Sequence, residues 1–307
     1  MTETIPVPET LDAYRTSQAY LGAFLGADHR RNERRTWLVT AVCAITLAAQ
    51  VAGGLLFRSM ALTAAGLHMA AHVAALLVAA GAYGLARRYA GSPRFTWGAG
   101  KLGDLAGFAN AVVLGLTAVL IAVESGRRLL QPQAVDYASA LPLAAGGLVV
   151  TLVCVWLLRP DRGAAQDLNL SAAHLHLSAD AGVGVLTIGG LVVGWRLGWP
   201  WADPLAGLAG AALVAQFAVS LIRRTAATLL DMTPSPDLTA EIRARLQAGG
   251  ERVLDLHVWR LGPGHHAAVA VVSAEPAPST HVLRARLAGL QGLSHLTVEA
   301  RGPRART

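Results

Sequence analysis

Residues 60–85 read MALTAAGLHMAAHVAALLVAAGAYGL. This stretch is long and apolar enough to cross about 30 Å of hydrocarbon as a helix. His68 and His72 stand inside it, and their i, i+4 spacing puts both imidazoles on one face of that helix. The stretch therefore predicts a transmembrane helix that carries two nitrogen ligands at membrane depth.

Five further segments have the same apolar character, so we predict six transmembrane helices. These segments lie near residues 37–57, 105–123, 138–158, 172–193 and 204–222. The whole chain of 307 residues is 53% hydrophobic and only 15% charged, which favours a membrane protein. The first segment follows a polar, arginine-rich lead and so does not have the pattern of a cleaved signal peptide.

The arginines predict the orientation. Twelve basic residues fall on one side of the predicted spans: Arg30, Arg31, Arg34, Arg35, Arg87, Arg88, Arg94, Lys101, Arg159, Arg162, Arg223 and Arg224. Four fall on the other side: Arg58, Arg127, Arg128 and Arg196. The positive-inside rule then places both termini in the cytoplasm of a multi-pass inner (plasma) membrane protein. The net charge of +7 reflects this topology and does not imply nucleic-acid binding.

A second ligand pair, His176 and Asp180, has the same spacing in the segment 172–193. Ionisable groups inside a membrane are costly and usually mark a functional path. His68 and His176 each lie roughly 12 to 14 Å along their helices, counted from opposite membrane surfaces. We therefore expect the two pairs to meet near the midplane as a cage of three imidazoles and one carboxylate, which suits Zn²⁺, Co²⁺ or Ni²⁺.

The chain becomes more polar after the sixth predicted span. A Pro-punctuated segment, 231–237, precedes a region too polar to cross a membrane, whose pattern predicts the order α-β-β-α-β. The predicted organisation is a tail (1–36), a six-helix domain (37–224), a linker (225–237), a C-terminal α+β domain (238–301) and a tail (302–307).

Several motifs resemble those of the cation diffusion facilitator family, from Ala27 to near the end of the chain. They are Gly66–His72, Asn169–Asp180, Phe95–Lys101, Gly198–Pro204 and Asp255–Trp259. The resemblance implies a divalent-metal/proton antiporter, a homodimer with six transmembrane helices and a cytoplasmic, ferredoxin-like domain. It implies no enzyme and no tightly bound cofactor, because the metal is the cargo.

The histidine pair in the second predicted span indicates one branch of this family. Many family members carry Asp-x-x-x-Asp or His-x-x-x-Asp where this chain has His68 and His72. Together with Phe24–His29 and Lys101–Gly107, the pair resembles the bacterial cobalt/nickel efflux branch, although Ala65 stands where many relatives carry an Asp. We expect Co²⁺ and Ni²⁺ as cargo, with Zn²⁺ also carried.

The chain lacks several histidines that form additional metal sites in some family members. The connection 86–101 has no His, and Leu254 and the segment 268–272 lack the histidines that some relatives use in the soluble domain. Other histidines remain in that domain: His257, His265, His266, His281 and His295. We expect dimerisation, and not metal binding, to be its main role.

Other polar residues in or near the predicted spans each have two interpretations. His174 lies on a different helical face from His176, so packing is favoured over ligation. Asn110 and Asp203 fit support of the site or of a proton path, and they fit a polar helix contact or an N-cap equally well. Cys43 and Cys154 fit small core residues.

Other functions stay open at the sequence level. A zinc-dedicated transporter of the same family fits the motifs, and so does a membrane metal sensor that does not transport. A bis-histidine haem protein also places His pairs on facing helices, but Asp180 argues against it. A membrane zinc hydrolase needs a general base such as the Glu of His-Glu-x-x-His, which the chain lacks.

Overall fold

The computed structural model describes residues 28–302 apart from 57–59, 132–134, 161–166 and 234–235. The side chains of residues 53–55, 60–68 and 71 also lie outside this description. The chain divides into two compact units. One, the helical unit, contains Ala27–Leu85 and Leu102–Thr225; the other, the sheet unit, contains Ala86–Lys101 and the chain from Ala226 onward.

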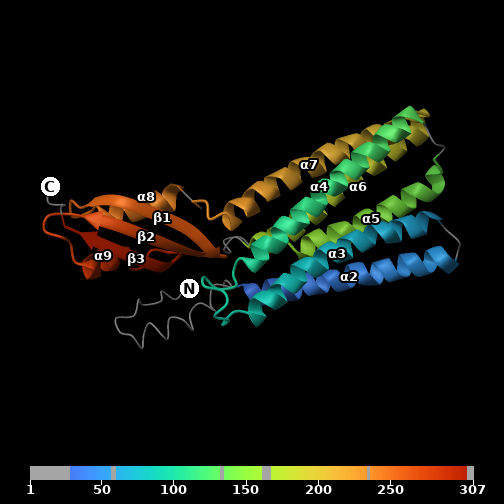
Figure 1. Cartoon of the computed structure of the whole chain (residues 1–307). Coiled ribbons are helices and arrows are strands. Elements are labelled where there is room, and N and C mark those ends of the chain that lie inside the picture. The colour runs from blue at the N-terminus through green and yellow to red at the C-terminus, as the bar shows by residue number, and fades with distance from the viewer. Residues whose placement is uncertain (1–27, 57–59, 132–134, 161–166, 234–235, 303–307) are drawn as a thin grey trace. The chain divides into compact units, whose positions relative to one another are not determined.

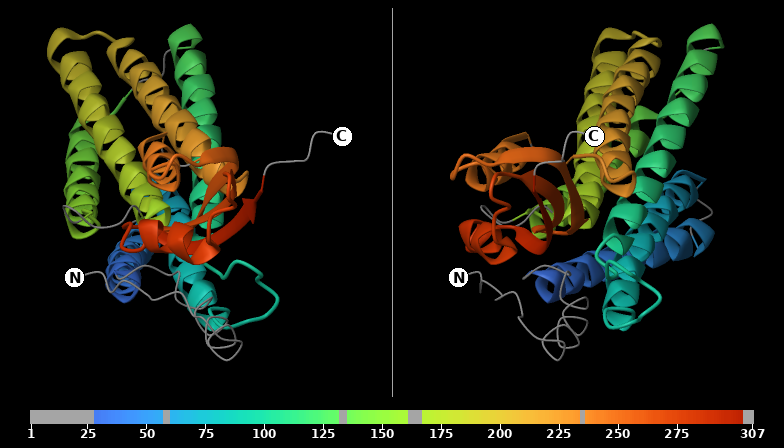
Figure 2. Two further views of the ribbon diagram at one scale, coloured as in Figure 1. Left: turned by 90° about the vertical axis from the view of Figure 1, so that its left-hand side faces the viewer. Right: turned by 60° about the vertical axis from the view of Figure 1, so that its left-hand side comes forward.

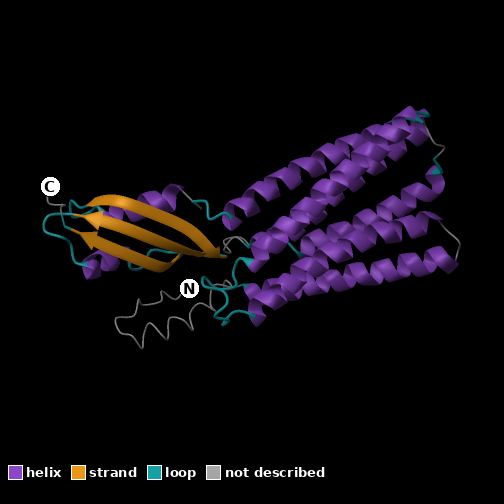
Figure 3. Ribbon diagram, viewed as in Figure 1, coloured by secondary structure: helices purple, strands orange, loops and turns teal. Residues whose placement is uncertain are grey.

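Long helices form the helical unit and continue slightly beyond it (Figures 1 and 3). They are α2 (His29–Leu56), α3 (Met60–Arg88), α4 (Leu102–Leu130), α5 (Tyr137–Leu157), α6 (Leu168–Leu197) and α7 (Ala202–Leu229). Within the described residues, α2, α4, α5, α6 and α7 are long and apolar enough to cross a membrane. Helix α3 coincides with the predicted second span, and its crossing of the membrane stays a prediction.

Most helices extend beyond the predicted apolar spans. Helix α2 begins at His29, well before the predicted start at residue 37, because its arginine-rich first turns continue the helix past the apolar part. Helix α6 begins after Asp167, whose carboxylate accepts hydrogen bonds from the N–H groups of Asn169 and Leu170. Helix α7 continues to Leu229, so the first residues of the predicted linker are helical.

Among the described residues, three buried clusters hold the helices together. One joins side chains of α2, α3, α5 and α6, and the other two join α4, α6 and α7. Helix α6 therefore takes part in all three clusters, in agreement with its place beside α4 and α7 in Figure 2. Gly107 lets α4 approach α6 closely, because a Cβ there would lie 3.3 Å from the carbonyl oxygen of Leu168.

The sheet unit contains one three-stranded sheet and two short helices. In chain order its elements are α8 (Pro236–Leu246), β1 (Arg252–Gly262), β2 (His265–Ser273), α9 (Thr280–Leu287) and β3 (Leu293–Arg301). Strand β2 lies between β1 and β3, antiparallel to the first and parallel to the second. The predicted order α-β-β-α-β is confirmed, and the ferredoxin-like classification stays a prediction.

The connection between α3 and α4 belongs to the sheet unit. Trp97 packs edge-on against Trp259 of β1 and His295 of β3, with ring centroids 5.2 and 5.0 Å away. These two residues flank Ala267 in neighbouring strands, and Ala267 is fully buried. The small side chain at this position leaves room for an indole ring above the sheet.

Candidate metal centre

Helices α3 and α6 bring three of the four predicted ligands together. Asp180 Oδ2 lies 3.3 Å from His72 Nδ1 and 3.3 Å from His176 Nε2. The two imidazole rings are perpendicular, with centroids 5.5 Å apart. Each of the three side chains is less than a tenth exposed. The i, i+4 spacing in α6 places His176 and Asp180 one above the other on the face that meets α3.

The distances suit a tetrahedral ion better than hydrogen bonds. Within the described residues, Asp180 Oδ2 is buried and accepts no hydrogen bond, although two ring nitrogens lie near it. Two ligands bonded at about 2.0 Å to a tetrahedral ion lie about 3.3 Å apart. The candidate ligand atoms of His72, His176 and Asp180 all lie within 4.8 Å of one another. These three residues can therefore hold one metal ion without large movement.

The fourth predicted ligand, His68, stands in α3 one turn before His72. Its side chain lies outside the described residues. Its role as a ligand stays a prediction.

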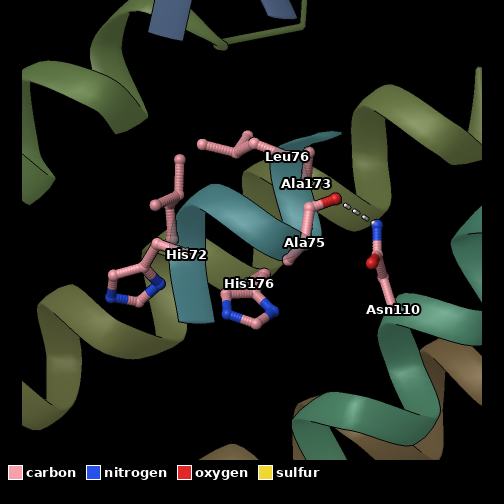
Figure 4. Close-up of a pocket in the computed structure, with 7 residues that line it drawn as sticks. His72, Ala75, Leu76, Asn110, Ala173 and His176 are labelled. Atoms are coloured by element: carbon pink, nitrogen blue, oxygen red, sulfur yellow. Dashed lines mark hydrogen bonds between the residues drawn. The ribbon is translucent and has the colours of Figure 1, made fainter. Parts of the chain in front are cut away.

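A small cavity of about 10 Å³ adjoins the centre, which is the space of about one water-sized sphere. His72, His176 and Asn110 of α4 contribute polar groups to its wall. Figure 4 shows the Asn110 amide turned towards α3, where Nδ2 donates to the carbonyl oxygen of Ala75 at 3.2 Å. Of the two interpretations of Asn110, the structure therefore shows an interhelical contact, and it lies at the edge of the candidate site.

The structure leaves two other predicted candidates outside the ligand group. His174 is not a member of that group, although it is only two residues from His176. Asp203 lies in the first turn of α7 and not at its N-cap, and its Oδ2 is 3.8 Å from Arg128 Nη1 of α4. Asp203 therefore contacts the end of α4 and does not line the cavity.

The comparison with protein families matches residues 36–230 to the cation efflux transmembrane domain. The chain belongs to the cation efflux family. The match covers every long helix apart from the first residues of α2. The resemblance to cation diffusion facilitators is thereby confirmed, and the chain is a multi-pass membrane protein.

Curated cation efflux proteins match most of the chain. Zinc transporter ZitB of Escherichia coli is 32% identical over 251 residues, which is 80% of this chain and 78% of that protein. A cadmium, cobalt and zinc/H(+)-K(+) antiporter of Bacillus subtilis is 28% identical over 287 residues, 90% of this chain and 91% of that protein. Metal cation efflux system protein CzcD of Cupriavidus metallidurans is also 28% identical over 287 residues, with coverages of 91% and 90%.

This cation efflux protein also has a polar network that the sequence analysis did not identify. Asp167, at the start of α6, accepts hydrogen bonds from Asn32 of α2 at 2.9 Å and from the hydroxyl of Tyr83 of α3 at 2.6 Å. Asn169 donates to the carbonyl oxygen of Ala79 in α3 at 2.8 Å. The N-cap position of Asp167 is a signal in the sequence, but its two partners lie far away in the chain. The network fixes one end of α6 against α2 and α3.

The histidines of the sheet unit have other contacts. His265 Nδ1 lies 2.8 Å from Ser294 Oγ, and His266 Nδ1 lies 3.2 Å from the carbonyl oxygen of Gly292. Exposed His257 pairs with Asp255 at 3.0 Å. Within the described residues, no group of three potential metal ligands lies in this unit.

Proposed function

We propose that this cation efflux protein exports divalent transition-metal ions from the cytoplasm in exchange for protons, through a site made by His68, His72, His176 and Asp180. The observation that carries the proposal is the buried group of His72, His176 and Asp180 between α3 and α6. A carboxylate buried in a membrane without a cation is costly. In a site that loads and releases a cation, this cost of the unpaired carboxylate favours binding of the cation.

Zn²⁺, Co²⁺ and Ni²⁺ are the proposed cargo. Imidazole and carboxylate ligands suit these borderline ions. Zinc and cobalt also appear in the names of the relatives from Escherichia coli and Bacillus subtilis. The preference for Co²⁺ and Ni²⁺ over Zn²⁺ rests on the His68/His72 pair and on the resemblance of Phe24–His29 and Lys101–Gly107 to the bacterial cobalt/nickel branch. The name of the Escherichia coli relative supports a zinc-dedicated transporter as the second candidate.

Proton coupling follows from the ligand chemistry. Metal binding requires deprotonated imidazole nitrogens, so protons and metal compete for the same atoms. A site open to a cytoplasm near neutral pH loads metal and releases protons, and a more acidic exterior favours protonation and release. The name of the Bacillus subtilis relative includes H(+) antiport, which supports the same coupling for this chain.

The proposal places a homodimer in the inner (plasma) membrane with both termini in the cytoplasm. The distribution of arginines on the predicted loops supports this orientation. The sheet unit then lies in the cytoplasm, where it serves dimerisation.

Transport by the purified protein in proteoliposomes tests the proposed site. His176→Ala and Asp180→Asn each remove one ligand, so we expect loss of metal-dependent proton flux and of metal uptake. His174→Ala is the matched control, because it removes an imidazole two residues away on the same helix, and it should transport like the unchanged protein. Equal flux from all three variants would remove the site. Metal binding without any flux in the unchanged protein would instead indicate a sensor.

Metal identity is tested by His72→Asp. This change exchanges a neutral nitrogen for a harder, anionic oxygen, so Zn²⁺ and Mn²⁺ uptake should gain on Ni²⁺ uptake. Uptake is measured metal by metal in inside-out vesicles for both proteins. An unchanged rank order of metals would show that selectivity arises outside this cage.

A further inference from the structure

The two cysteines of the chain meet inside the helical unit. Cys43 of α2 and Cys154 of α5 are 111 residues apart in the sequence, yet their Sγ atoms are 3.7 Å apart. Both side chains are almost completely buried, with exposures of 1% and 0%. The proposed transport cycle uses neither thiol.

A third sulfur belongs to the same surroundings. Met69 of α3 is 4% exposed and lies in the buried cluster that contains both cysteines. The other buried members of this cluster are aliphatic. Thiol and thioether sulfurs are soft donors, which select a different class of ion from the imidazoles and carboxylate of the His/Asp centre.

We propose that Cys43 and Cys154 form a second metal site, which takes a thiophilic cation such as Cd²⁺. Two sulfurs bonded at about 2.3 Å to a tetrahedral Zn²⁺ lie about 3.8 Å apart, and the longer bonds of the larger Cd²⁺ require a few tenths of an ångström more. The observed 3.7 Å therefore allows both thiols to share an ion with little movement of α2 and α5. A disulfide, with its bond of about 2.05 Å, requires the two sulfurs to approach much further.

Metal binding at the two cysteines needs no oxidant. Each thiol loses its proton to solvent, two sulfur–metal bonds form and two protons leave for each divalent ion. Cys154 stands three residues before the end of α5, which is about 5 Å along the helix axis. Once bound, the ion joins α2 to α5.

Cd²⁺ titration of the purified full-length protein tests the site. Asp180→Asn is the starting variant, because removing the carboxylate of the transport centre separates this proposal from the proposed function. Under a phosphine reductant we expect one Cd²⁺ per chain with a thiolate-to-metal charge-transfer band in the ultraviolet. Cys43→Ser and Cys154→Ser, each added to Asp180→Asn, should lose that band and the bound ion. Retention of the same Cd²⁺ stoichiometry in both of these serine variants would overturn the site.

A second measurement needs no cysteine substitution. Cadmium X-ray absorption on the Asp180→Asn protein should show sulfur neighbours, and a shell of nitrogen and oxygen alone would contradict the proposal. Thiol counting of the denatured protein, prepared without reductant, should find two free thiols. If it finds none, the pair is a disulfide and the metal site is excluded.

Discussion

Asn110 is the residue whose contacts connect the candidate metal centre with the packing of the bundle. Its amide belongs to α4, donates to the backbone of α3 and lines the same small cavity as His72 and His176. The acceptor, Ala75, is three residues after His72. The hydrogen bond therefore fixes the rotation of α3 close to a ligand, and we expect it to influence metal binding without direct coordination.

Replacing Asn110 by Ala should lower metal transport several-fold and cost about 1 kcal/mol of stability, since interhelical hydrogen bonds in membranes have about that size. Metal affinity and uptake are measured side by side with thermal stability in detergent. Thr117→Ala is the control on the same helix, because its hydroxyl donates only to the carbonyl of Val113 within α4. Unchanged metal affinity in Asn110→Ala would show that this contact serves packing alone.

At the scale of whole elements, side chains of α2 and α3 both donate hydrogen bonds to Asp167, the residue immediately before α6. Asp167 caps α6 and also accepts from Asn32 and Tyr83. Asp136 caps α5 through the same two kinds of backbone contact, and no side chain of another helix is bonded to it in the described structure. The two aspartates therefore form a matched pair that differs in the bonds between helices.

Asp136→Ala should cost about 1 kcal/mol, the usual value of an N-cap. Asp167→Ala should cost clearly more, because it also leaves Asn32 and Tyr83 without their acceptor. Unfolding midpoints of both variants in the same detergent give the comparison. Equal losses in the two proteins would mean that the contacts from α2 and α3 add nothing to stability.

Trp97 packs a second element, the connection between α3 and α4, against the sheet. Edge-to-face aromatic pairs are worth about 0.5–1.5 kcal/mol each, and Trp97 makes two such ring contacts. Trp97→Ala should therefore release the connection from the sheet and speed tryptic cleavage after Arg94. Trp201→Ala is the control, because Trp201 stacks on Trp199 between α6 and α7. Cleavage at the same rate as in the unchanged protein would contradict this role of Trp97.

At the scale of the whole molecule, the sheet unit should be sensitive to acid. In the sheet unit, Arg286 Nη1 donates to Glu251 Oε2 at 2.7 Å, and this hydrogen bond lowers the pKa of Glu251 to about 2 from an ordinary 4.5. A carboxylate whose pKa is lowered by folding stabilises the folded state fully above its unfolded value. That stabilisation is lost as the pH falls from about 4.5 towards 2.

The sheet unit should therefore lose stability in this pH window, and Glu251→Gln should remove most of that pH dependence. Limited proteolysis of the full-length protein by pepsin, which is active in this pH window, follows the unfolding of the sheet unit in each variant. Glu299→Gln is the control, because the Glu299–Arg301 pair is half-exposed and solvent weakens it. An acid response that is the same with and without Glu251 would exclude the ion pair as its origin.

The sequence alone determined the membrane setting and the order of elements in the C-terminal domain, and it predicted the types of the candidate ligands. A helix is the only way for a single apolar segment of about 20 residues to satisfy its backbone in lipid, so length and composition suffice. The i, i+4 spacing of His176 and Asp180 places both side chains on one helical face, which is also a local effect. Helix ends were less predictable, because polar turns such as the start of α2 continue beyond the apolar part.

Only the tertiary structure decided which faces meet. Periodicity tells which side of a helix a residue occupies, but it does not say which neighbour packs there or at what level. The contacts of Asp167 with Asn32, of Asn110 with Ala75 and of Cys43 with Cys154 join residues 135, 35 and 111 positions apart. The close approach of His72 to Asp180 likewise depends on the packing of α3 against α6. Long-range packing of the helices, and not any local pattern, sets these distances.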